Sequence, residues 1–128
     1  VFVSPPEFAQ SRANKAAVKE FLQSVREKFE RVVWEAPPSW DADDAASLAL
    51  DMKVIPARDP LAHGALDAEI AYYRLPGPAG HKSRYEDPAI EKLASIAKEA
   101  KHKEATYVFT NVDMFADAKR FKKAMKLA

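Results

Sequence analysis

Four polar residues stand at or just after the ends of short apolar runs, where the chain could bind a ligand. They are Glu35, Asp59, Arg74 and Asn111. Ligands of parallel α/β proteins bind beyond the carboxyl ends of the strands, so these side chains would share one site if the runs were neighbouring strands. Arg74 has the fork geometry that clamps a carboxylate or a phosphate. We therefore predict a ligand site for a small anion, formed by these four residues.

Two further interpretations of the same residues stay open. Glu35 and Asp59 could work as an acid–base pair or as ligands of a hard metal, which would make the protein an enzyme acting on a phosphorylated or carboxylated small molecule. Alternatively the groups could satisfy one another, with Arg74 paired to Glu35 or Asp59, and with Asn111 and Asp113 capping helices. We expect no intact catalysis.

Several other chemistries are excluded by what the chain lacks. It contains no cysteine, which excludes a disulfide scaffold, a thiolate metal site and a cysteine nucleophile. His63, His81 and His102 come from different loops and have no metal-ligand spacing. No phosphate loop, dinucleotide-binding glycine motif or serine elbow occurs. We therefore predict no cofactor and no metal.

The elements that must position these residues alternate along the chain. Five short runs are rich in β-branched or aromatic residues, which predicts buried strands, and their continuous apolar character favours a parallel sheet. Amphipathic segments between the runs predict helices. The fold class is therefore α/β, with five mostly parallel strands alternating with helices in one domain over residues 1–128. The runs are 1–3, 32–34, 54–57, 70–73 and 107–109.

The helices are predicted from their apolar stripes and capping residues. Ser11 or Asn14 would cap the first helix, and a second spans 41–52. Asp87 would cap the third, with Pro88 at its first position, and the last spans about 115–127. The stripe of the first helix consists of Val18, Phe21, Leu22, Val25 and Phe29.

Several of these segments resemble one known family. The order and spacing of Trp34-Glu35, Tyr72-Tyr73-Arg74-Leu75 and Phe109-Thr110-Asn111 are similar to those of the YecE-like family, the domain of unknown function numbered 72. The resemblance implies a TIM-like barrel without settled biochemical function, of which this chain would be the C-terminal part. Ala36-Pro37, Pro76 and Thr110 stand where that family usually has Arg-His, His and Asn, which implies a lost or changed activity.

The overall charge favours no particular partner. Lys and Arg number 20 and Asp and Glu 19, so nothing draws the whole chain to nucleic acid or membrane. The last helix is nevertheless basic, with Lys119, Arg120, Lys122, Lys123 and Lys126. This pattern would suit a nucleic-acid contact. It is more typical of a solvated helix face whose cations complement the C-terminal dipole, and we expect the latter.

Composition and strand count lead to expectations about compartment and assembly. The absence of a leader and of a long apolar run predicts a cytoplasmic protein, and nine prolines with few amides fit a thermophile. Five strands cannot close with normal barrel geometry, and open apolar edges promote association. We expect a homo-oligomer, either a dimer or a multiple of dimers. The alternative is a monomer with an open, helix-covered sheet.

Overall fold

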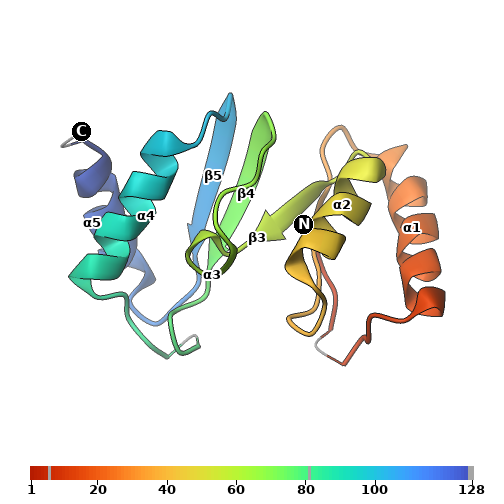
Figure 1. The fold of residues 1–128 in the computed structure, drawn as a ribbon, viewed down its shortest axis with the longest axis horizontal. Coiled ribbons are helices and arrows are strands. Elements are labelled where there is room, and N and C mark those ends of the chain that lie inside the picture. The colour runs from red at the N-terminus through yellow and green to blue at the C-terminus, as the bar shows by residue number, and fades with distance from the viewer. Residues whose placement is uncertain (6, 81, 127–128) are drawn as a thin grey trace. The chain divides into compact units, whose positions relative to one another are not determined.

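Strands and helices alternate along the part of the chain that the computed structural model describes, residues 1–5, 7–80 and 82–126 (Figure 1). The predicted α/β fold class is confirmed, since five strands alternate with helices and the strands that pair within each unit are parallel. The chain divides into two units, Val1–Ala57 and Arg58–Ala128. Each unit is described below by itself.

The N-terminal unit contains three strands in chain order. β1 pairs with β2 through Phe2 opposite Trp34, and β2 pairs with β3 through Val33 opposite Ile55. The two helices bury Val18, Leu22 and Ala49 against Trp34 and its neighbours, and this burial stabilises the unit. The elements are β1 (Phe2–Val3), α1 (Arg12–Arg26), β2 (Val33–Glu35), α2 (Ala42–Asp51) and β3 (Ile55–Arg58), whose last residue belongs to the second unit.

Side-chain caps fix where both helices of this unit begin. The Ser11 hydroxyl accepts a hydrogen bond from the Asn14 amide at 3.1 Å, and a carboxylate oxygen of Asp41 accepts one from the Asp44 amide at 2.9 Å. Each cap satisfies a backbone N–H group that has no partner inside its helix. Of the two caps considered for the first helix, Ser11 is therefore the one used.

Two residues of the predicted apolar stripe on α1 are not buried. Phe21 is 44 % exposed and Phe29 is 55 % exposed, so the expectation that both face the core is wrong. Phe29 lies beyond the end of α1 at Arg26 and so does not follow the helical periodicity. Phe21 lies at the rim of the core, where its ring meets Phe2 edge-on at 5.0 Å between centroids.

The C-terminal unit is built on a six-residue parallel ladder from Ile70 opposite Glu104 to Leu75 opposite Phe109. Alternate residues of β4 are buried, and Leu75 packs into a cluster with residues of α4 and α5. Figure 1 accordingly shows α4 and α5 together on one side of β4 and β5. The elements are α3 (Pro60–His63), β4 (Ile70–Leu75), α4 (Asp87–Glu99), β5 (Glu104–Phe109) and α5 (Met114–Lys126).

Two expectations about this unit need correction. Asp87 is not the cap of α4, because the helix begins at Asp87 and its N-cap residue Glu86 makes no side-chain bond. The Asp87 carboxylate instead forms an ion pair with Arg120. The strand predicted over 107–109 begins earlier, at Glu104, and is only partly buried, because Tyr107 and Val108 are half-buried and Phe109 is buried. The added residues 104–106 are exposed.

Candidate functional site

The four residues predicted to form a ligand site belong to both units. Glu35 ends β2 in the N-terminal unit, opposite Val3 in the strand register. Asp59, Arg74 and Asn111 belong to the C-terminal unit. Within that unit, Asn111 donates a hydrogen bond to Asp117. Burial raises the pKa of Tyr85 to about 12, and the charges of Asp59 and Asp117 both add to this effect.

Asp59 acts as a helix cap. One of its carboxylate oxygens accepts a hydrogen bond from the Leu61 amide at 3.0 Å, at the start of α3. Burial raises the pKa of this carboxyl group, although the backbone N–H groups of Leu61 and Ala62 and the nearby His63 act in the opposite direction. Asp59 therefore has a structural role that the sequence pattern did not separate from a catalytic one.

Asn111 forms a hydrogen bond with the loop that precedes α4. It is 2 % exposed, and its Nδ2 donates to the Ser83 carbonyl at 3.0 Å and to Asp117 Oδ2 at 2.7 Å. Both amide hydrogens are thus used, which also establishes which way the carboxamide points. Asn111 Oδ1 and the Thr110 hydroxyl are buried without a hydrogen-bond partner among the described residues. Asn111 is therefore bound within the protein and does not cap a helix through a backbone amide.

Asp117 is the centre of this network, although no pattern in the sequence points to it. Its side chain is fully buried and accepts bonds from the Tyr85 amide at 3.0 Å and from Arg120 Nη1 at 2.9 Å. Burial by itself would raise the pKa of the Asp117 carboxyl, but the hydrogen bonds from Tyr85, Asn111 and Arg120 and the charge of Arg120 lower it overall. The carboxylate therefore stays ionised inside the protein.

Arg120 belongs to the same network and not to a solvated basic face. Besides Asp117, its guanidinium binds the Tyr85 carbonyl at 2.5 Å and the Asp87 carboxylate. The hydrogen bond to Asp87, followed by the bond to Asp117 and the charges of both carboxylates, raises the pKa of Arg120, while burial acts in the opposite direction. The other cations of α5 are exposed, namely Lys119, Lys122, Lys123 and Lys126.

Arg74 lies on the opposite face of β4 from the buried core. Its neighbours Tyr73 and Leu75 are buried, whereas Arg74 is half-buried and stands opposite Val108 of β5. Successive side chains of a strand point to opposite faces. Arg74 and the core-facing Tyr73 therefore point to different sides of the strand pair.

His102 is part of a hydrogen-bonded pair that the sequence did not reveal. In the structure its Nε2 lies 2.6 Å from the Tyr73 hydroxyl, and its Nδ1 lies 2.6 Å from the Ala68 carbonyl. His63 closes α3, and His81 lies outside the described residues.

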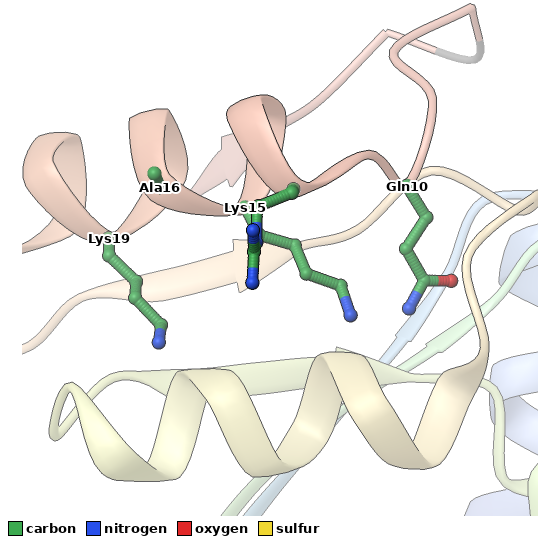
Figure 2. A pocket seen from close by; sticks show the side chains of 5 residues that line it. Gln10, Lys15, Ala16 and Lys19 are labelled. Atoms are coloured by element: carbon green, nitrogen blue, oxygen red, sulfur yellow. The ribbon is translucent and has the colours of Figure 1, made fainter.

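The described residues also form a basic groove on α1. It measures about 390 Å³ and is lined by Gln10, Arg12, Lys15, Ala16 and Lys19. Figure 2 shows Lys15 and Lys19 extending from α1 on the same side as the Gln10 amide, toward α2. Gln10 is held in place, since its Oε1 accepts from the Asp41 amide at 2.8 Å and its Nε2 donates to Asp44 at 3.2 Å.

The cations of this groove are electrostatically unfavourable for α1. Lys15 and Lys19 are four residues apart, a spacing at which like charges destabilise a helix. Arg12 and Lys15 lie in the first turns of α1, where the helix dipole disfavours positive charge, and no acid occupies the first turn. Helix α2 in contrast begins with Asp43 and Asp44. None of the three groove cations forms an ion pair with any of the residues that the structure describes.

No group of three His, Cys, Asp or Glu residues within 1–5, 7–80 and 82–126 could hold a metal ion. None of the helices in these ranges is sufficiently long and apolar to cross a membrane.

Comparison of the sequence and the structure with known proteins gives no relative. No family model, no curated protein and no solved structure matches the chain.

Proposed function

We propose that this chain binds a small phosphorylated or carboxylated molecule in the basic groove of α1. One observation carries the proposal. Arg12, Lys15 and Lys19 line a single groove, and none of them forms an ion pair among the described residues. A bound anion would remove the repulsion between neighbouring cations and the unfavourable interaction with the helix dipole.

The chemistry of the groove favours a phosphate or carboxylate over other ligands. Guanidinium and ammonium groups form charge-assisted hydrogen bonds with these anions, and such bonds are about twice as strong as neutral ones. Ala16 lies between the cations on the helix surface and leaves room for the ligand because its side chain is small. The Gln10 amide forms one end of the groove and is already fixed by its bonds to Asp41 and Asp44.

The strand-end residues support a ligand site less well. Asp59 caps α3 and Asn111 binds Ser83 and Asp117, so both have structural roles. Arg74 stays a predicted anion ligand at the end of β4, and the resemblance to the YecE-like family stays a prediction. We propose no catalytic step.

The proposal is tested by titrating ¹⁵N-labelled protein with inorganic phosphate and with citrate at low ionic strength. We expect saturable amide shifts at Gln10, Arg12, Lys15 and Lys19, which weaken as salt is added because exposed charges are screened. The double variant Lys15→Gln/Lys19→Gln should bind at least tenfold more weakly. Lys28→Gln, an exposed lysine outside the groove, is the matched control and should bind as the wild type does.

Two results would overturn the proposal. The first is the absence of saturable shifts in α1 with either anion. The second is undiminished binding by the double variant, which would mean that the anion occupies another surface.

A further inference from the structure

We infer that the ligand of the basic groove carries at least two anionic groups, in the manner of a short polyphosphate or a bisphosphate. This inference rests on the proposed function and adds the class of ligand. It depends on how the three cations are spaced along α1, which is a property of the helix and of the groove together.

The three cations form a stripe along the helix and not a cluster around one point. An α-helix turns about 100° and rises about 1.5 Å per residue, so Arg12, Lys15 and Lys19 fall within about 60° of one another and span about 10 Å along the axis. Side chains three and four residues apart lie on the same helix face. Arg12 and Lys15, or Lys15 and Lys19, are therefore helix neighbours that can contact one phosphate together, whereas Arg12 and Lys19 are seven residues apart and are not neighbours on the helix surface.

One phosphate that contacts two neighbouring cations would leave the third cation of the stripe without an anionic partner. If it bound between Lys15 and Lys19, the charge of Arg12 would still face the positive end of the α1 dipole. A second anionic group on the same molecule would neutralise that charge without the entropic cost of binding a second molecule. The preference for a ligand with two anionic groups follows from this difference.

Gln10 and Asp44 determine at which end the ligand can extend. Gln10 Nε2 donates to Asp44 at 3.2 Å, so this hydrogen is not offered to a ligand, and the Asp44 carboxylate beyond it repels an anion. The groove is thus positive along α1 and limited by a negative charge at the Gln10 end. This arrangement suits a short molecule lying along the helix better than a long strand that continues past Gln10.

The experiment compares three probes by isothermal titration calorimetry at low ionic strength: inorganic phosphate, tripolyphosphate and a single-stranded oligonucleotide of twelve nucleotides. We expect tripolyphosphate to bind at least tenfold more tightly than phosphate and more tightly than the oligonucleotide. In Arg12→Gln tripolyphosphate should lose at least tenfold in affinity and phosphate distinctly less, so that the advantage of tripolyphosphate over phosphate should largely disappear. Lys28→Gln should keep the full advantage, and circular dichroism verifies that both variants are folded.

Four other results of the calorimetry would overturn this inference, and one of them would also overturn the proposed function. Equal affinities for phosphate and tripolyphosphate would overturn this inference and leave the proposed function intact. Tighter binding of the oligonucleotide, or an advantage of tripolyphosphate that survives in Arg12→Gln, would also overturn it. Failure of all three probes to bind would overturn the proposed function as well.

Discussion

The Tyr73 hydroxyl and the His102 ring share a hydrogen bond of 2.6 Å that joins β4 to the segment before β5. Its direction follows from the other ring nitrogen. Nδ1 lies 2.6 Å from the Ala68 carbonyl, and because a carbonyl only accepts, Nδ1 carries a hydrogen. In the neutral ring Nε2 then accepts from Tyr73, whose oxygen also accepts from the Leu66 amide at 3.0 Å.

Removal of the Tyr73 hydroxyl is expected to destabilise the protein. Tyr73→Phe leaves the Leu66 amide without its acceptor and His102 Nε2 without its donor, and a buried unsatisfied group costs about 1 to 3 kcal/mol. Urea unfolding measures the loss. Tyr72→Phe is the matched control, since Tyr72 is the half-buried neighbour on the other face and its hydroxyl has no hydrogen bond with any described residue. A change within about 0.5 kcal/mol is expected. Equal losses in the two variants would contradict the role assigned to the Tyr73–His102 bond.

Acid sensitivity is expected to depend on Asp117. Its folded-state pKa lies below the ordinary 3.8. Above pH 3.8 the carboxylate is ionised in both states, so its stabilising contribution is complete; as the pH falls below this value the unfolded chain takes up the proton first and stability decreases. Asp117→Asn should lower the stability at neutral pH and flatten the acid side of a plot of unfolding free energy against pH.

The matched control for Asp117 is Asp113→Asn. Asp113 is partly exposed and lies 3.8 Å from Arg84, and such a surface pair contributes about 0 to 1 kcal/mol. The alanine variant of Asp117 should lose about 3 to 5 kcal/mol, because it leaves Arg120 and the Tyr85 amide without their buried partner. An unchanged acid transition in Asp117→Asn would show that another group controls it.

Gly77 is expected to be the least replaceable glycine of the C-terminal unit. Its φ is +107°, and an added Cβ would lie 2.1 Å from the Gly80 carbonyl oxygen and 2.7 Å from Ser83 Oγ. Its amide also donates to the Tyr85 hydroxyl at 2.7 Å. Gly80 has a similar φ of +99° but open space around it. Gly80→Ala should therefore cost only the backbone strain of about 1 to 3 kcal/mol, and Gly77→Ala distinctly more. Calorimetric melting temperatures compare the two, and equal losses would contradict the steric argument.

Self-association remains our expectation for the protein in solution. In the N-terminal unit the apolar surface beside β1 includes Val3, 62 % exposed, and Phe21, 44 % exposed, next to a groove of about 340 Å³ lined largely by apolar side chains. Light scattering at micromolar concentration should detect a dimer or larger species. Val3→Lys/Phe21→Lys should shift it toward the monomer, while Phe115→Lys, an exposed apolar residue of the other unit, should not. A wild-type monomer of 14.3 kDa would contradict this expectation.

The fold class could be read from local patterns because each pattern is a property of neighbouring residues. Short β-branched runs favour extended backbone, and apolar residues at helical spacing favour helices, whatever lies elsewhere in the chain. The ends of the elements were less predictable. β5 begins at the charged Glu104 because its register with Ile70 extends the ladder, and pairing with a distant strand leaves no mark in a local window.

The candidate site shows the same contrast between local sequence patterns and contacts made across the fold. The residue types and spacing of Arg12, Lys15 and Lys19 are visible in the sequence, yet so are those of Arg120 and its lysine neighbours. Only the tertiary structure separates them. Packing of α5 beside Tyr85 encloses Asp117 and Arg120 in a network whose bonds to Tyr85 join residues more than thirty positions apart. Arg12, Lys15 and Lys19 of α1, in contrast, form no ion pair with any residue that the structure describes. Which charges are already neutralised depends on contacts across the fold, and a charge that the fold leaves unpaired is the one able to bind a ligand.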